Sequence, residues 1–226
     1  MEAIRGRDQR SLVGRPLIGT IINSSVGLTP GETAALVEKL VQGGVDFIKD
    51  DELMADPPQC PFADRVRAVM AVIRRHAERS GRKTMFAFNI TGEIDEMLAR
   101  HDLVVQERWT CVMVSLNWVG TTGVARLRRH ATLPIHGHRN GWGFFTRCPA
   151  LGFEFKAWHK VHRLAGADHI HVNGLRNKFS ESTTRLSPPR ACASRGCSPT
   201  IPIPCKSCPC SRPGRRSDRR RTRSRP

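Results

Sequence analysis

The feature of this sequence that most limits its fold is an alternation of short apolar runs with longer amphipathic stretches, repeated six times between residues 17 and 172. Runs of this kind are typical of strands buried on both faces, and no short hairpin connection joins consecutive runs. Strands that alternate with helices form parallel sheets, so we predict an α/β fold. We expect strands at residues 17–22, 45–48, 85–89, 111–116, 133–138 and 169–172.

The amphipathic stretches between these runs carry helix signals. Thr29 is predicted to be an N-cap, with Pro30 at the first helical position, Glu32 completing a capping box and Gly43 ending the helix. In the next stretch one face is apolar and the arginines are predicted to lie largely off it. The apolar face comprises Val66, Val69, Met70 and Ile73, and the arginines are Arg65, Arg67, Arg74 and Arg75. Further helices are expected through residues 94–98, 124–129 and 155–164.

Polar residues follow nearly every predicted strand. A barrel gathers the carboxyl ends of all its strands at one mouth, whereas a doubly wound sheet brings together only those near its switch point. The spread over six strands therefore favours an incomplete TIM (β/α)8 barrel of about six units at residues 16–179, preceded by a lead at residues 1–15. The polar residues are Asn23, Lys49 to Glu52, Asn89, Asn117, His138 to Asn140 and His171 to Asn173.

The strongest chemical signal is Lys49-Asp50-Asp51-Glu52, directly after the second predicted strand. Mg²⁺ prefers a few carboxylates together with water and substrate oxygens, so this loop is a candidate metal site. A solvated acidic loop is the alternative. The lysine beside the carboxylates favours the metal site, because such pairs occur where the chemistry of a group is tuned.

Two His-x-His pairs, His136/His138 and His169/His171, lie on the fifth and sixth predicted strands. Residues i and i+2 of a strand face the same side, so each pair points together. A single strand histidine is usually a core residue. Two adjacent pairs accompanied by Arg139 indicate a pocket for a phosphorylated substrate, with a three-histidine zinc site as the alternative.

Several ordered segments resemble the catalytic domain of the RuBisCO large chain, and they are most similar to the RuBisCO-like proteins (form IV). The resemblance covers about residues 14–181, so it spans all six predicted units. Its segments are LIGTIINSSVGL at residues 17–28, GVDFIKDDE at 44–52, residues 85–90, LPIHGHRNGWG at 133–143 and GADHIHVNGLRNKF at 166–179.

The resemblance implies a magnesium site. Lys49 matches the family lysine that CO₂ converts to a carbamate and that then binds Mg²⁺, and Asp51 and Glu52 match the other two metal ligands. A neutral amine is a poor ligand for Mg²⁺ whereas a carbamate oxygen is a good one, which explains a lysine in this cluster. The implied chemistry is lyase or enolase-type, with an enediolate formed from a sugar phosphate or an oxo-acid phosphate.

The resemblance also implies substrate contacts. His138, Arg139 and His171 match residues that contact the sugar phosphate, and Lys178 matches the lysine of a mobile loop that closes over it. Lys49, His138 and Lys178 are therefore the implied catalytic residues. The HGHRNGWG segment is similar to that of members that decarboxylate or isomerise oxo-acid phosphates.

Two departures from the family pattern argue against a true carboxylase. Asn23, a predicted substrate contact, stands where the family has a catalytic lysine, and Ser25 replaces a second one. An asparagine does not act as a general base near neutral pH. We also expect the family's N-terminal domain and last two strands to be missing, which puts the family's homodimer in doubt. The alternative function is a non-catalytic, truncated pseudoenzyme.

Residues 180–226 differ in composition from the rest of the chain. They hold 12 of the 37 Lys and Arg but 2 of the 20 Asp and Glu, together with 8 of the 15 prolines and 5 of the 8 cysteines. We predict a disordered basic tail produced by a frameshift. The alternatives are a nucleic-acid-binding tail, disfavoured because the tail has no aromatic residue for stacking, and a zinc site at Cys205, Cys208 and Cys210.

Two further features concern location. No apolar run approaches the roughly 18 residues that span a bilayer, and the charged first 15 residues do not match a secretory signal. The three cysteines before residue 180 (Cys60, Cys111 and Cys148) are scattered. A reduced, cytoplasmic protein without membrane association is therefore expected. The partner that the family resemblance implies is a small sugar phosphate.

Overall fold

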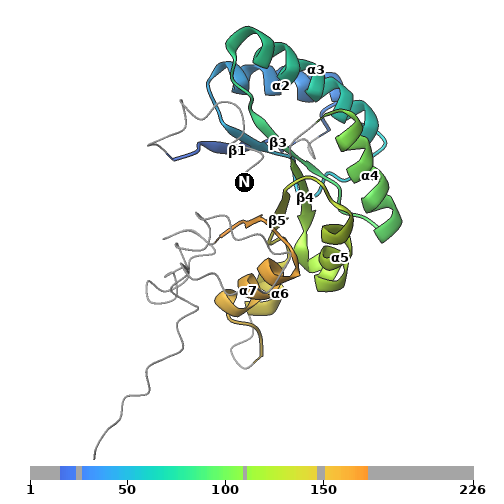
Figure 1. The fold of residues 1–226 in the computed structure, drawn as a ribbon, viewed down its shortest axis with the longest axis vertical. Helices are drawn as coiled ribbons and strands as arrows, with labels where there is room; N and C mark the ends of the chain where they lie inside the picture. Colours follow the sequence, from blue (N-terminus) through green and yellow to red (C-terminus); the bar gives the residue numbers. More distant parts are fainter. Residues whose placement is uncertain (1–15, 24–26, 109–110, 147–150, 173–226) are drawn as a thin grey trace, which may run out of the picture. The chain divides into compact units, whose positions relative to one another are not determined.

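A six-stranded sheet forms the centre of the computed structural model, which describes residues 16–23, 27–108, 111–146 and 151–172 (Figure 1). Every strand is parallel to its neighbours, and the strand order follows the chain from β1 to β6 without reversal. A doubly wound sheet reverses its order at a switch point, so this topology confirms the predicted partial barrel. The strands are β1 (Gly19–Ile21), β2 (Phe47–Lys49), β3 (Met85–Asn89), β4 (Cys111–Ser115), β5 (Ile135–His138) and β6 (His169–Ile170).

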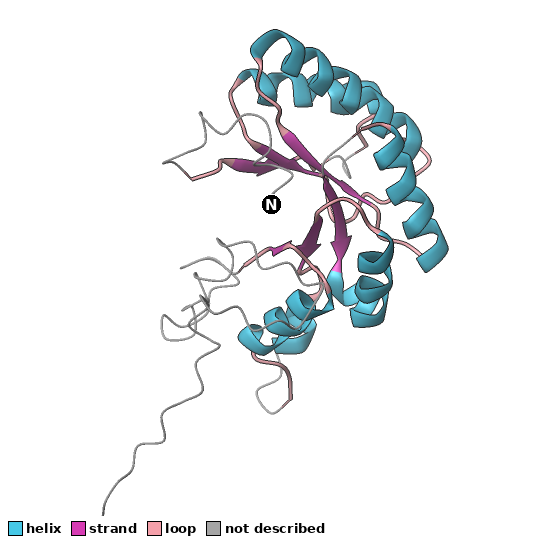
Figure 2. Cartoon of the chain, in the orientation of Figure 1, coloured by secondary structure: helices cyan, strands magenta, loops and turns pink. Residues whose placement is uncertain are grey.

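Helices connect the strands and lie along the outer side of the curved sheet (Figure 2). This one-sided arrangement is that of a barrel, whose helices form an outer ring. None of the helices in the described residues is both long and apolar enough to cross a membrane. The helices are α2 (Pro30–Gln42), α3 (Phe62–Ser80), α4 (Ile94–Gln106), α5 (Leu116–His130), α6 (Trp142–Thr146) and α7 (Phe155–Ala165).

The central strands are buried on both faces, which explains why their sequences are apolar without alternation. All five residues of β3 and all five of β4 are buried. Phe86 and Phe88 of β3 pack in the large cluster beneath the helices, whereas Met85 and Ala87 belong to a smaller cluster on the other face. The second cluster is what a barrel interior requires, because a barrel is filled by side chains.

The predicted capping box at the start of α2 is confirmed. The Thr29 Oγ1 accepts a hydrogen bond from the backbone N–H of Glu32 at 3.3 Å, and the Glu32 carboxylate accepts one from the backbone N–H of Thr29 at 2.8 Å. The backbone and side-chain hydrogen bonds from Thr29 lower the pKa of Glu32. Each bond satisfies an N–H group that the helix itself leaves unpaired.

Replacing Thr29 by Ala is expected to lower the free energy of unfolding by about 1 kcal/mol at pH 7. Because the Glu32 pKa is lowered in the folded protein, the stabilisation from its carboxylate is present above the ordinary value of 4.5 and is lost as the pH falls through the folded pKa. Urea denaturation of wild type and Thr29→Ala from pH 7 to pH 3 measures this. The difference should shrink with acidification, and a Thr132→Ala control in an exposed loop should show no such trend.

Several elements have different bounds from those predicted. α5 begins at Leu116, directly after β4, and runs across a non-helical Gly120 at φ 66°, a left-handed conformation that glycine adopts without strain. The predicted helix around residues 124–129 is therefore only its second half. α6 was not predicted, because five residues are too few to show a helical period. Leu36, which the 3.6-residue period places on the apolar face of α2, is exposed.

Candidate functional site

The ends of β2, β5 and β6 come together at the carboxyl edge of the sheet. Glu52, just after β2, lies with its Oε2 3.7 Å from His138 Nε2 at the end of β5, and the rings of His138 and His171 are 5.0 Å apart. β2 and β5 are separated by two strands in the sheet, so this contact exists only because the sheet curls. Candidate site residues that lie in separate segments of the sequence thus form one cluster.

Lys49 is the last residue of β2 and is buried. Its Nζ donates hydrogen bonds to Glu52 Oε2 at 2.9 Å and to the Asp50 carbonyl at 3.0 Å. Burial alone raises the pKa of Glu52, but the hydrogen bond and the charge of Lys49 outweigh it, and the pKa is lowered overall. Glu52 is therefore ionised at neutral pH and faces the lysine amine directly.

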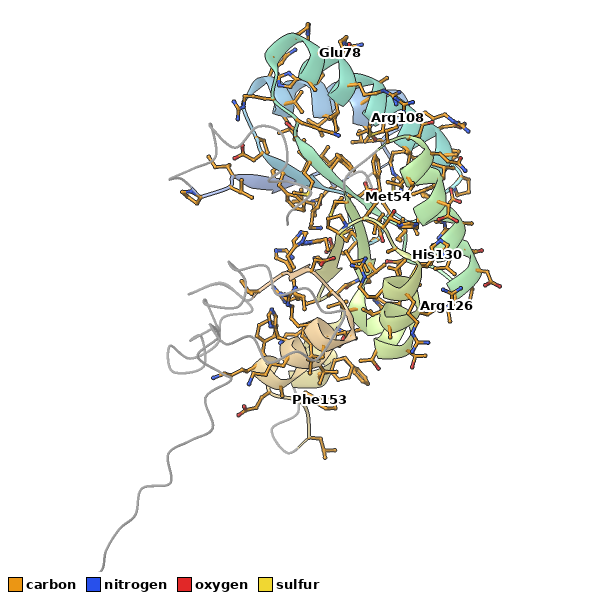
Figure 3. All side chains as sticks on the ribbon, viewed as in Figure 1. Met54, Glu78, Arg108, Arg126, His130 and Phe153 are labelled. Atoms are coloured by element: carbon orange, nitrogen blue, oxygen red, sulfur yellow. The ribbon has the colours of Figure 1, made fainter. Side chains whose placement is uncertain are left out.

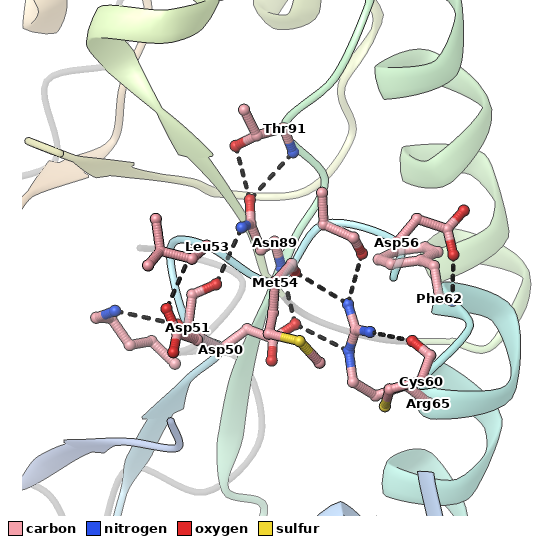
Figure 4. Close-up of polar contacts among 12 residues, drawn as sticks. Asp50, Asp51, Leu53, Met54, Asp56, Cys60, Phe62, Arg65, Asn89 and Thr91 are labelled. Atoms are coloured by element: carbon pink, nitrogen blue, oxygen red, sulfur yellow. Dashed lines mark hydrogen bonds and ion pairs between the residues drawn. The ribbon is translucent and has the colours of Figure 1, made fainter. Parts of the chain in front are cut away.

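Asp51 is buried, and the loop that carries it is held at several points (Figure 4). Its Oδ1 accepts a hydrogen bond from the Leu53 N–H at 2.9 Å, and its carbonyl accepts one from Asn89 Nδ2 at 3.0 Å. Asn89 Oδ1 in turn accepts from the Thr91 hydroxyl at 2.6 Å. The end of β3 thereby fixes the backbone between Lys49 and Glu52.

The prediction that Arg65 lies largely off the apolar face of α3 is wrong, because this side chain is completely buried. Its Nε donates to Asp50 Oδ2 at 3.1 Å, and its two other nitrogens donate to the carbonyls of Met54, Ala55 and Cys60 at 2.8–3.2 Å (Figure 4). The guanidinium thus ties the loop after β2 to α3. It is satisfied by one carboxylate and three carbonyls, which is why it tolerates burial.

The sequence contains a signal that Arg65 is buried. Val69, Val72 and Ile73 follow it at i+4, i+7 and i+8, and all three are buried, so Arg65 occupies a position on the buried stripe. Its partner Asp50 sits between two residues of the predicted metal cluster. Burial raises the pKa of Asp50 to about 6, and the Arg65 guanidinium opposes this rise, so the carboxylate is ionised at pH 7.

The His-x-His pairs face the same side of the sheet, as predicted. His136 and His169 occupy paired positions in β5 and β6 with ring centroids 4.5 Å apart, and both approach Phe47 of β2 at 5.4 and 5.6 Å. His138 and His171 form the next layer toward the carboxyl edge. His138 and His171 therefore belong to the candidate site, whereas His136 and His169 belong to the packed interior.

His136 and His138 are neutral at pH 7. Burial and the nearby Lys49 lower the pKa of His138 to about 3, and burial and the other histidines lower that of His136 well below its usual range. Neither ring nitrogen of His136, nor Nδ1 of His138, has a hydrogen-bond partner among the described residues. Buried polar atoms without partners are uncommon, and Nδ1 of His138 lies at the edge where a bound molecule is expected.

Gly137 allows the two layers of histidines to stand beside α5. A Cβ atom at this position would lie 2.8 Å from Leu116 Cδ1 and 3.1 Å from two further carbons of the same side chain. Leu116 is fully buried at the start of α5, so it has little room to give way. The glycine between the histidines thus serves close packing, and the histidines on either side point to the opposite face.

The remaining predicted site residues are placed as follows. Arg139 directly follows His138 and is half-buried, whereas Asn23 is exposed just beyond β1. The N–H of Ile22 donates to the Lys49 carbonyl at 3.1 Å, so Asn23 stands at the same edge as the lysine. Lys178 lies outside the described residues, as do the predicted tail and its cysteines.

The donor set at this edge fits Mg²⁺ in its chemistry. Asp51 and Glu52 supply hard carboxylate oxygens, and Glu52 reaches Lys49 Nζ at 2.9 Å. A carbamate formed on Nζ would therefore lie beside Glu52. The negative charge of this carbamate would take the place of the positive charge that Lys49 now presents to Glu52. The histidines of this edge do not make a zinc site: among the described residues, the group with three convergent metal-ligand atoms is His101, Asp102 and His130.

Comparison with known proteins finds relatives that match most of this chain. The chain is 60% identical over 171 residues to the 3-oxo-isoapionate-4-phosphate transcarboxylase/hydrolase of Xanthobacter autotrophicus, covering 76% of this chain and 41% of that protein. It is 44% identical over 169 residues to the 3-oxo-isoapionate-4-phosphate decarboxylase of Rhizobium rhizogenes, covering 74% and 40%. The chain thus spans about 40% of the length of these curated relatives.

The solved structures give the same fold. A RuBisCO-like protein from Burkholderia fungorum superposes with a TM-score of 0.74 at 51% sequence identity, covering 77% of this chain and 43% of that one. The family model for the ribulose bisphosphate carboxylase large chain, catalytic domain, matches residues 4–187. That match takes in every described strand and the whole cluster at their carboxyl edge. The chain therefore belongs to the RuBisCO large-chain family and, within it, is similar to the RuBisCO-like proteins.

Proposed function

We propose that this chain carries the catalytic edge of a Mg²⁺-dependent lyase that acts on a phosphorylated 3-oxo sugar acid. The observation that carries the proposal is the contact of the buried Lys49 with the partly exposed Glu52 at 2.9 Å, with His138 3.7 Å from Glu52. The substrate class comes from the relatives, whose names give 3-oxo-isoapionate 4-phosphate as the compound they act on.

The residues that would hold the metal are Lys49 as its carbamate, Asp51 and Glu52. Bound there, Mg²⁺ would polarise a substrate carbonyl and stabilise the negative charge that develops on its oxygen. The protein's own part is to keep the three ligands in place. It does so through the Arg65 contacts and through Asn89, which donates to the Asp51 carbonyl.

The substrate phosphate is expected to lie near Arg139, whose guanidinium always carries its charge. His138 and His171 would then bind polar substrate oxygens. Because its pKa is about 3, His138 is neutral in the free protein and acts as a hydrogen-bonding group there, not as a cation. A phosphate nearby would raise this pKa, since an opposite charge favours the protonated ring.

Asn23 in place of a basic residue is compatible with decarboxylation. When a 3-oxo acid loses CO₂, the bond between the carboxylate carbon and its neighbour breaks, and its electron pair moves toward the ketone to form an enolate. No proton has to be removed first, so the forward step needs no general base at this position. A proton from water or an acidic group then completes the product.

The test is CO₂ release from 3-oxo-isoapionate 4-phosphate by the full chain, with and without Mg²⁺. We expect metal-dependent turnover, and an Arg139→Gln variant should raise KM about 10- to 100-fold, as loss of a charged hydrogen bond does. Arg126→Gln, an exposed residue on α5, is the matched control and should leave KM unchanged. A folded chain that neither turns over nor binds this compound would overturn the proposal and favour the non-catalytic alternative.

A further inference from the structure

Two histidines and an aspartate join α4 to α5, apart from the candidate active site. His101 and Asp102 belong to α4, and His130 is the last residue of α5, on the helical side of the sheet (Figure 3). His130 ends its helix before β5 begins, so it lies toward the amino edge of the sheet, whereas the candidate active site lies at the carboxyl edge. The three residues therefore form a separate cluster.

The polar atoms of this cluster converge. Asp102 Oδ1 lies 2.9 Å from His101 Nδ1 and 2.6 Å from His130 Nε2, and the three ligand atoms are all within 4.8 Å of one another. The two imidazole rings stand edge to face, with centroids 5.2 Å apart and planes at 74°. Both histidines thus direct a nitrogen at one carboxylate oxygen.

We propose that His101, Asp102 and His130 form a binding site for a divalent transition-metal ion, with Zn²⁺ as the best match. Two imidazole nitrogens and one carboxylate oxygen are ligands that zinc takes in proteins, and water fills the fourth position of such three-ligand sites. The ion would link α4 to α5. This proposal does not depend on the proposed lyase function.

One of the three residues is buried and the other two are partly exposed, so an ion can reach the cluster from solvent. His101 is 1% exposed, so its ring is held firmly in the interface between the helices. The side chains of Asp102 and His130 are 51% and 31% exposed, which leaves them able to move. Zinc at about 2.0–2.1 Å from each ligand separates neighbouring ligand atoms by about 3.4 Å. Small shifts of the two exposed side chains are enough to open the present contacts to that spacing.

The charge of Asp102 and the orientation of His101 suit a cation here. Hydrogen bonds from His101 and His130 lower the pKa of Asp102, so the site contains a carboxylate at neutral pH. The nitrogen of His101 that faces the cluster is Nδ1, 2.9 Å from Asp102 Oδ1, so it is the ligand atom that this ring offers.

The test measures Co²⁺ and Zn²⁺ binding to the metal-free full chain by equilibrium dialysis and Co²⁺ absorption. The chain has other histidines and cysteines, so differences between variants decide the outcome. His130→Ala and Asp102→Asn change exposed side chains and should each remove one bound equivalent or weaken its binding at least tenfold. His76→Ala on α3 is the matched control and should retain it.

A third variant is expected to gain a signal rather than to lose binding. His130→Cys exchanges one zinc ligand for another, so it should still bind Co²⁺ and add a thiolate-to-cobalt absorption band that wild type lacks in a difference spectrum. Circular dichroism of each variant without metal checks that it is folded. Unchanged stoichiometry and affinity in folded His130→Ala and Asp102→Asn, with no new band in His130→Cys, would overturn the proposal.

Discussion

Replacing Arg65 by Met is expected to lower the free energy of unfolding by about 3–5 kcal/mol, because it leaves the Asp50 carboxylate buried without its cation. Both side chains of this pair are 0% exposed, and the same guanidinium satisfies the carbonyls of Met54, Ala55 and Cys60. Methionine has similar length, so the loss reports the polar contacts more than the packing. Urea denaturation at pH 7 measures the effect.

The pH dependence identifies the cause. The pKa of Asp50 is about 6 in the folded protein against an ordinary 3.8, and without Arg65 only the hydrogen bond from the Asn89 backbone N–H would oppose its rise. A raised carboxyl pKa means that the folded state takes up the proton first as the pH falls, so the penalty for the buried charge is full above the folded pKa and disappears toward 3.8. The loss in Arg65→Met should therefore be smaller at pH 5 than at pH 8.

Two companion variants separate this account from general damage to α3. Arg67→Met alters an arginine on the same helix whose side chain is 61% exposed, and it should change stability by no more than about 0.5 kcal/mol. Arg65→Met combined with Asp50→Asn removes both charges and should recover part of the lost stability. A double variant as unstable as the sum of the two single ones would contradict a charge-pair origin.

Lys49→Arg is expected to reduce lyase turnover by about 10²- to 10³-fold or more, while the protein stays folded. Arginine keeps the positive charge beside Glu52, but its guanidinium remains protonated and does not form a carbamate. The variant thus preserves the ion pair of the free protein and removes the proposed metal ligand. The measurement is CO₂ release at saturating Mg²⁺ and bicarbonate.

A matched control shows whether a lysine-to-arginine substitution lowers turnover wherever it is made. Lys39→Arg at the end of α2 makes the same substitution away from the carboxyl edge, and its turnover should equal that of wild type. Turnover in Lys49→Arg close to that of wild type would mean that the lysine has no part in metal binding.

The sequence was sufficient to predict the barrel because local signals and tertiary packing agree along most of the chain. The capping box at Thr29 and the buried strand at Met85–Asn89 appear as predicted. The His-x-His pairs also face together, because side-chain direction in a strand has a strict period of two. These features depend on residues close in sequence, whose geometry is set by the backbone alone.

The features that sequence reasoning missed depend on pairs distant in the chain. Arg65 tolerates burial because Asp50, 15 positions earlier, and three carbonyls surround it. The sequence of α3 alone does not indicate that Asp50 is its partner. His101 meets His130 only after α4 and α5 pack together. The run Lys49 to Glu52 predicted a candidate metal site by itself, but the individual roles of Lys49, Asp51 and Glu52 came from the family resemblance.

The most direct test of the central proposal is to look for the carbamate itself. The full chain is equilibrated with ¹³C-bicarbonate and Mg²⁺, and its ¹³C spectrum is compared with that of Lys49→Arg. We predict a carbamate resonance that requires Mg²⁺, that disappears on chelation and that the variant lacks. A folded wild-type chain with no carbamate resonance in the presence of Mg²⁺, or a resonance that persists in Lys49→Arg, would contradict a metal site built on Lys49.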